Sequence, residues 1–409
     1  MSTAARASID PRMDRAIARV LDAAHEAPPH RLPEVVADGA ALLGATSSRL
    51  WLSDAQRRLL VHLTTDPEPD TLPIEGSAGG RAYALAANVE IDRDDGGHHL
   101  WVPLIDGVDR VGVLELDLPA DGHDEVAEPL RNAIRHLASI AAAEVVTRGQ
   151  YTDQFIATRR RRPMTVAAEL QWQALPPLSF STVDVSVAGM LEPAYETGGD
   201  SFDYAHDHRG LSMAILDAVG HNLRSTMICT LAMGAYRNQR RAGADLHEIA
   251  DVMDAVIHAE IGDGYYATGQ LGHLETATGV LRWINAGHPL PLLIRDGRVI
   301  KELPCRPRLP FGWAHLQQSR VVETAEVQLE PDDAIFFYTD GIVEARGPGG
   351  TDFGVDRLED FLQRSFAAQL PPSETVRRLS HDVLDYHGGR LQDDATTLLL
   401  VWHPGGVAG

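Results

Sequence analysis

The 409-residue chain is poor in cysteine and has no long apolar run. Its two cysteines, Cys229 and Cys305, cannot build a disulfide framework, which is expected of a protein from a reducing compartment. Residues 1–15 are small, polar and charged and do not read as a signal peptide. No apolar stretch reaches the roughly 20 residues that a membrane helix needs. These absences predict a cytoplasmic protein.

Basic residues are also scarce relative to acidic ones, and the formal net charge is −22. Phosphate backbones select basic surfaces, so this charge argues against nucleic acid as a partner and disfavours anionic membranes. Hydrophobic residues make up 44% and charged residues 23%, as in soluble globular proteins. The length leaves room for two or three domains.

The first part of the chain, residues 1–150, has the pattern of a small α+β module. An amphipathic helix opens it, with Ile17 and Leu21 at helical spacing. Short strands follow, then a hairpin that turns at Asp106 and Gly107, and a long helix from Val126 closes the segment. Helices and antiparallel strands in this order predict a self-sufficient domain.

A connector, residues 151–177, follows. Helical periodicity runs on past Val145 towards Ile156, and four arginines at 159–162 precede Pro163. We interpret the arginine run as a solvated linker rather than an anion-binding patch. A second helical pattern stops at Pro176 and Pro177, where helices commonly end.

The third part, residues 178–405, alternates strands with paired helices. Half-buried strands are predicted where apolar residues alternate, and helices are predicted from about 223 to 241 and from 246 to 257. A later helix is expected to begin near Ser373, a good N-cap residue. This order predicts sheets covered by helices, so the expected fold class of the whole chain is α+β.

Four short acidic motifs lie at the ends of apolar runs or beside glycine. They occupy residues 198–203, 217–221, 338–341 and 393–396. Each alone is typical of a plain turn with a capping acid. Carboxylates at strand ends can converge at one sheet edge, however, and oxygen ligands are those that hard divalent cations prefer. The four motifs together indicate a metal centre suited to phosphate chemistry.

In this order the motifs resemble the bacterial SpoIIE-type branch of the metal-dependent serine/threonine protein phosphatases, the PPM superfamily. The resemblance covers about residues 176–403. It also rests on Trp-Ile-Asn-Ala-Gly-His-Pro at 283–289, on the helix at 170–177 and on Phe353 and Gly354. It implies a β-sandwich of antiparallel sheets flanked by α-helices, with two Mn²⁺ or Mg²⁺ ions at one edge.

The resemblance also implies roles for individual residues. Asp217 would bridge two ions with help from the Ala218 carbonyl, Asp340 and Asp393 would complete one shell, and Asp200 would serve the other ion directly or through water. Asp217, Asp340 and Asp393 would therefore be the catalytic carboxylates. Water activated by the two ions would hydrolyse phosphoserine or phosphothreonine without a phospho-enzyme. Supporting positions that match the pattern are Gly199, Asp203 and Asp394.

Two residues next to this set each have two possible roles. His221 is a candidate proton donor to the leaving oxygen, but its spacing from Asp217 also suits a structural turn. Asn222 stands where the family usually has glycine. It is either a helix cap or a residue that crowds the substrate.

Residues 1–150 resemble a GAF-like sensory domain, through the strand order and the Gly- and Ala-rich stretch at 74–82. No cysteine precedes Cys229, which excludes covalent bilin attachment and a thiol switch in this domain. His98 and His99 suggest a metal or haem site, but we favour a polar turn. The signal bound here is not specified by the sequence.

The leading hypothesis is a phosphatase that acts on a phosphorylated anti-anti-sigma (STAS-type) protein under control of the GAF-like domain. The connector would reposition the turns at Asp200 and Asp217, and its apolar stripe suggests a parallel homodimer. The alternatives are a catalytically weak sensor or scaffold that binds a partner-switching protein, and a sensor with a purely structural metal site. Asn222 is the support for the weak scaffold.

Overall fold

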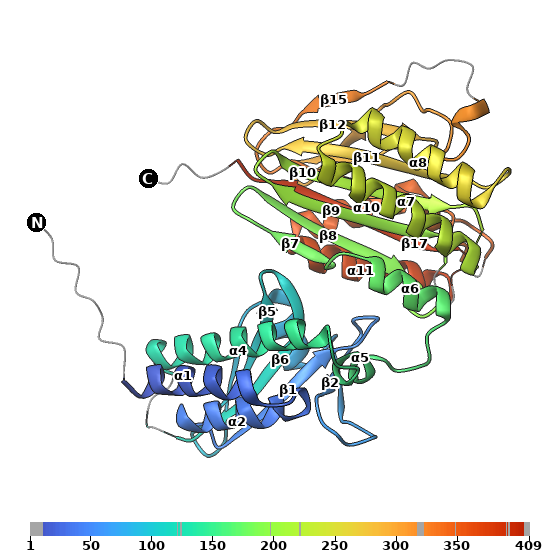
Figure 1. The fold of residues 1–409 in the computed structure, drawn as a ribbon. Helices are drawn as coiled ribbons and strands as arrows, with labels where there is room; N and C mark the ends of the chain where they lie inside the picture. The colour runs from blue at the N-terminus through green and yellow to red at the C-terminus, as the bar shows by residue number, and fades with distance from the viewer. Residues whose placement is uncertain are drawn as a thin grey trace, which may run out of the picture. The chain divides into compact units, whose positions relative to one another are not determined.

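The computed structural model describes residues 11–120, 122, 125–196, 198–220, 222–316, 323–347, 349–389, 391 and 393–404. The chain separates into two units, Met1–Arg162 and Pro163–Gly409, which are coloured from blue to red along the sequence in Figure 1. Across the described residues, no helix combines the length and the apolar character required to cross a bilayer.

The N-terminal unit is built on one antiparallel sheet with the strand order β3-β2-β1-β6-β5-β4. Its strands are β1 (Ser47–Ser53), β2 (Leu59–His62), β3 (Thr71–Pro73), β4 (Val89–Asp92), β5 (His98–Asp106) and β6 (Asp109–Leu118). Its helices are α1 (Pro11–Glu26), η1 (Pro29–Arg31), α2 (Leu32–Leu42), α3 (Ala78–Leu85), α4 (Glu128–Gly149) and α5 (Gln154–Arg159).

Alternate residues of this sheet bury themselves in two different cores, because successive strand side chains point to opposite faces. Leu50 and Leu52 pack with α1, α2 and α4, whereas Trp51 lies between them in sequence and packs with α3 on the other face. The long helix α4 contributes Ile134 and Leu137 to the first core.

Two expectations for this half of the chain need correction, and a third loses the observation that supported it. The helix after Val126 does not run through to Ile156, because α4 ends at Gly149 and a separate short helix, α5, follows. Its apolar stripe is buried against the unit's own sheet, so the observation behind the parallel homodimer is lost and the dimer stays an untested prediction. His98 and His99 do not form a polar turn.

These two histidines instead begin β5 and face acidic side chains. Buried His98 places Nδ1 3.3 Å from Glu90 and 3.4 Å from Asp92. His99 Nδ1 lies 2.7 Å from Asp117. The strand forms here because β5 is paired on both sides, with β4 and β6, and this pairing outweighs the local polarity.

The C-terminal unit contains two antiparallel sheets. One has the order β15-β12-β11-β10-β9 and the other β14-β13-β16-β17-β8-β7. The strands are β7 (Ser179–Ser181), β8 (Val185–Glu192), β9 (Asp200–Asp207), β10 (Gly210–Ala218), β11 (Ala267–Glu275), β12 (Val280–Ala286), β13 (Leu292–Arg295), β14 (Arg298–Glu302), β15 (Ala325–Gln328), β16 (Ala334–Tyr338) and β17 (Ala395–Trp402). The helices are α6 (Val166–Ala174), α7 (Leu223–Ala242), α8 (Leu246–Ile261), η2 (Ala314–Leu316), α9 (Asp340–Val343), α10 (Val355–Ala367) and α11 (Pro372–Tyr386).

The two sheets pack face to face and helices cover their outer faces. Phe202, Ile215 and Phe337 belong to the core between the sheets. A second core lies under α7 and α8, which cross the five-stranded sheet in Figure 1, and a third lies under α10 and α11. The predicted α+β class and the β-sandwich flanked by helices are confirmed. Ser373 is not an N-cap, since α11 begins one residue earlier with a proline in its first turn.

The surroundings of two glycines in this unit predict opposite effects of substitution by alanine. A Cβ at Gly189 on β8 would lie 2.2 Å from Cζ of the fully buried Phe202 on β9, so Gly189→Ala should destabilise the protein by about 1–3 kcal/mol. Gly234 is exposed in the middle of α7, and a Cβ there meets no described atom within 4 Å. Gly234→Ala should therefore stabilise it by about 0.5–1 kcal/mol. Thermal unfolding of the two variants beside the parent measures both; equal midpoints for all three would contradict the close sheet packing.

Candidate metal centre

Asp200 and Asp217 lie side by side at one edge of the sandwich. Asp200 begins β9, Asp217 precedes the last residue of β10, and the two are direct partners in the antiparallel ladder. Phe202 and Ile215, two residues further along each strand, face the other sheet. Because strand side chains alternate, both carboxylates point into the space between the sheets.

The opposite sheet meets Asp200 through two threonines. Thr339 follows the buried strand β16, and its Oγ1 donates a hydrogen bond of 2.7 Å to Asp200 Oδ2. The backbone N–H of Thr396 on β17 donates to the same Thr339 oxygen at 2.9 Å. Asp340 comes next in the chain and begins α9. Thr339 thus joins the two sheets next to Asp200 and Asp340.

Asp394 anchors the turn before β9. Its Oδ2 accepts hydrogen bonds from the backbone N–H groups of Gly198, Gly199 and Asp200 at 2.8, 2.5 and 3.3 Å. These three bonds occupy one carboxylate oxygen of a buried side chain. The neighbouring Asp393 is exposed, so adjacent aspartates of one motif have different surroundings.

Helix α7 holds the carbonyl side of the same turn. Thr226 Oγ1 donates to the Gly198 carbonyl and Cys229 Sγ to the Gly199 carbonyl, both at 2.7 Å. The Ala218 N–H also donates to the Gly199 carbonyl, at 2.9 Å. A Cβ on Gly199 would lie 2.7 Å from the carbonyl oxygens of Ala218 and Gly220. Glycine at this position therefore leaves the Ala218 carbonyl unobstructed.

The carboxylates at this edge raise one another's pKa values. Burial first, then the charges of Asp340 and Asp393, raise the pKa of Asp217 to about 7. Burial and the charges of Asp217 and Asp394 raise the pKa of Asp200 well above its usual range. Burial, Glu344 and Asp393 raise the pKa of Asp340. Like charges gathered in a half-buried space are stabilised by a cation, so the donor set fits divalent metal.

Asp203 is not part of this group. It lies three residues after Asp200 on β9 and so faces the other side of the sheet. There it is buried and pairs with Arg237 and Arg240 of α7, each at 2.9 Å. Arg237 also donates to the carbonyl of Ala174 at the end of α6, at 2.5 Å.

A pocket of about 280 Å³ opens beside the acidic edge. Asp340 and Asp393 line it together with Glu344 and Arg346. Sequence reasoning missed several residues that line or support this edge: Glu344, Arg346, Thr339, Thr396 and Cys229. Thr339 was within reach of sequence reasoning, because it stands between a buried strand and Asp340; Cys229 was not, since nothing in the sequence relates it to Gly199.

Asn222 and His288 have structural roles near this edge. His221 lies outside the described residues. Asn222 has extended backbone and caps α7: its Oδ1 accepts from the Arg224 N–H at 2.9 Å, and its own N–H donates to Ser225 Oγ at 2.8 Å. His288 is buried, which lowers its pKa to about 3, and its Nδ1 lies 2.9 Å from Thr268 Oγ1. This neutral histidine serves the fold of the 285–289 turn.

The C-terminal unit is thus a sandwich of two sheets with acidic strand ends gathered at one edge. Residues 207–403 match the family model described as "Stage II sporulation protein E (SpoIIE)". The C-terminal unit therefore carries the similarity to SpoIIE-type domains of the PPM superfamily that the motifs predicted.

Individual proteins resemble parts of the chain. Protein IcfG of Synechocystis is 27% identical over 147 residues, which are 36% of this chain and 22% of that protein. Phosphoserine phosphatase RsbP of Bacillus subtilis is 22% identical over 205 residues, 49% of each chain. The chain thus spans half or less of these curated relatives. Among solved structures, the SiaA-PP2C domain of Pseudomonas aeruginosa is 21% identical with a TM-score of 0.48, covering 58% of this chain and 94% of that one.

The raised pKa of Asp217 predicts a stability effect in metal-free protein. With EDTA at pH 8 the folded state must hold this side chain ionised beside other carboxylates, so Asp217→Asn should raise the unfolding midpoint by about 2–8 °C. The folded pKa of about 7 lies above the ordinary aspartate value of 3.8. The wild-type protein therefore gains stability as the pH falls through 7, and the difference between the two proteins should shrink by pH 6. Differential scanning fluorimetry measures this; a variant that is no more stable at pH 8 would contradict the mutual repulsion.

Proposed function

We propose that the C-terminal unit is a metal-dependent protein phosphatase that hydrolyses phosphoserine or phosphothreonine on a regulatory protein. One observation carries the proposal: Asp200 and Asp217 are ladder partners at one end of β9 and β10, and Asp340 and Asp393, at strand ends of the other sheet, line one pocket. The charges of Asp340 and Asp393 raise the pKa of Asp217, which supports a position close to it.

The donor set supports Mn²⁺ or Mg²⁺. Carboxylates and a backbone carbonyl are hard oxygen ligands, which these ions prefer. We propose that Asp217 and the Ala218 carbonyl hold ions together with Asp340 and Asp393, and that Asp200 takes part directly or through water. Bound there, two ions would activate a water molecule for attack on phosphorus and neutralise the phosphoryl oxygens.

Other residues of the chain would position the metal ligands and the substrate. Thr339 orients Asp200 by its hydrogen bond, and Asp394 holds the 198–200 turn by three N–H groups. Gly199 keeps space in front of the Ala218 carbonyl. The pocket next to Asp340 and Asp393 provides room for a phosphorylated side chain. Arg346 lines it, pairs with Asp352 at 3.2 Å and would add a positive charge beside the phosphate.

We further propose that the substrate is a phosphorylated anti-anti-sigma (STAS-type) protein. The resemblance to the SpoIIE-type branch and the similarity to a protein named phosphoserine phosphatase support this. Control by the GAF-like N-terminal unit would pass through the connector. Its last helix, α6, is linked by Arg237 to Asp203, which lies on the same strand as Asp200.

The alternative of a catalytically weak scaffold rested on Asn222. That residue caps α7 with its backbone extended, and Gly220, two residues earlier, takes the left-handed conformation, with φ of 91°. Asn222 therefore has a structural role of its own, and the enzyme is the function we retain.

Release of phosphate from a phosphoserine protein, with and without Mn²⁺, tests the proposed activity. Asp217→Asn and Asp340→Asn should each lower turnover at least about a hundredfold, because each removes a charged ligand. EDTA should abolish turnover in the parent, and Mn²⁺ or Mg²⁺ should restore it.

Asp207→Asn is the matched control for these variants. Asp207 ends the strand that Asp200 begins, is exposed, and pairs with Arg209 at 2.9 Å, so its loss should leave turnover unchanged. Equal inactivity of the parent and all variants at saturating metal, with an authentic phosphoprotein, would defeat the enzyme hypothesis.

A further inference from the structure

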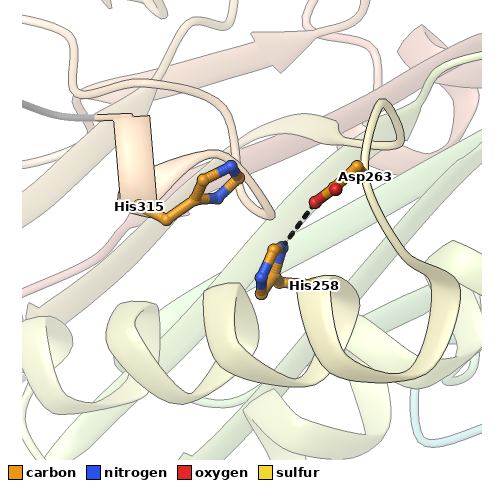
Figure 2. A group of neighbouring side chains, drawn as sticks. All are labelled: His258, Asp263 and His315. Carbon is orange, nitrogen blue, oxygen red and sulfur yellow. Dashed lines mark ion pairs between the residues drawn. The ribbon is translucent and has the colours of Figure 1, made fainter.

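A second group of potential metal ligands lies on α8 and the loops beside it. His258 is in the last turn of α8, Asp263 follows in the loop to β11, and His315 is on η2. Their ligand atoms all lie within 4.8 Å of one another, and the three side chains are exposed. Figure 2 shows the two imidazole rings and the carboxylate turned towards a common space.

The distances within this group are close to those of ligands on one ion. His258 Nδ1 lies 3.5 Å from Asp263 Oδ1, and the rings of His258 and His315 have centroids 4.3 Å apart. Two ligands of a tetrahedral zinc ion, each bonded at about 2.0–2.1 Å, stand about 3.3 Å apart. Small rotations of the exposed side chains are therefore sufficient to close the group around a cation.

The backbone that carries His315 is fixed against α8 by Asp254. This buried carboxylate lies one helical turn before His258, on the same helix face. Its Oδ1 accepts from the N–H groups of Gly312 and Ala314 at 2.6 and 3.1 Å, and its Oδ2 pairs with buried Arg308. The residue after Ala314 is His315, so the anchor places it next to His258.

Two further contacts fix the same loop. A Cβ at Gly312 would lie 2.7 Å from Ile257 Cγ2, which shows how closely this backbone approaches α8. The rings of Tyr266 and Trp313 have centroids 4.1 Å apart, joining the loop that carries Asp263 to the one that carries His315. The three ligands thus stand on segments whose relative positions are already determined by packing.

We propose that His258, Asp263 and His315 bind a transition-metal dication of the Zn²⁺ class, with water completing the shell. Two imidazoles and one carboxylate are a set that favours zinc and its neighbours over magnesium. The site is distinct from the oxygen-only acidic edge. A bound ion would link the loop that carries Asp263 to the loop that carries His315. The first of these loops contacts the end of β10, because the Tyr266 carbonyl accepts from the N–H of Val219, the residue after Ala218, at 3.1 Å.

Zinc binding in excess Mg²⁺ tests the proposal, because magnesium in excess competes for the oxygen ligands of the proposed metal centre at the acidic edge. The full chain is dialysed against Zn²⁺ and 10 mM-scale Mg²⁺, and bound zinc is measured by elemental analysis, with zinc X-ray absorption as the second readout. We expect about one zinc ion per chain and imidazole scattering in the spectrum. His258→Ala and His315→Ala should each weaken binding at least about tenfold and lower that scattering, because one of the two imidazoles is lost.

His208→Ala is the control, since His208 is an exposed histidine at the turn between β9 and β10. It should retain zinc like the parent. Unchanged unfolding midpoints in EDTA show that the variants are folded. Zinc retained with the same stoichiometry and Kd in His258→Ala and His315→Ala, or no zinc bound by the parent, would overturn the site.

Discussion

The turn formed by Gly198 and Gly199 is held from two sides, and the candidate metal centre depends on it. The carboxylate of Asp394 accepts its N–H groups, while Thr226 and Cys229 of α7 donate to its carbonyls. Strand β17, helix α7 and strand β9 therefore meet at one point. Since buried backbone groups are costly to leave without partners, this closed set of bonds fixes where Asp200 begins β9, and through the ladder it fixes Asp217.

The same edge carries an electrostatic cost. The acids that converge there raise one another's pKa values, so the metal-free fold is stable in spite of the site rather than because of it. Packing elsewhere offsets this cost: the core between the sheets and two further cores under the helices are built from buried, mostly apolar side chains. Strain of this kind is commonly found at functional sites, where the arrangement serves a ligand.

Sequence patterns predicted which helices and strands form better than they predicted the residues at which these begin and end. Periodicity identified α7 almost to its ends, because Asn222 and Gly243 cap it locally. Periodicity also carried the helix after Val126 too far, since it does not register the break between Gly149 and Gln154. His98 and His99 were expected in a turn because they are polar, but pairing with two neighbouring strands places them in β5. Long-range pairing overrides local preference in such cases.

By itself the sequence determined the class of fold, the strand ends that carry Asp200, Asp217, Asp340 and Asp393, and the resemblance to a phosphatase family. Order along a chain is enough for this, because each motif is local. Only the tertiary structure decided that Asp203 pairs with arginines of α7 while Asp200 accepts from Thr339 of the other sheet, and that Asp254 brings His315 to His258. Those outcomes depend on which faces are buried and which distant segments pack together, and no local pattern contains that information.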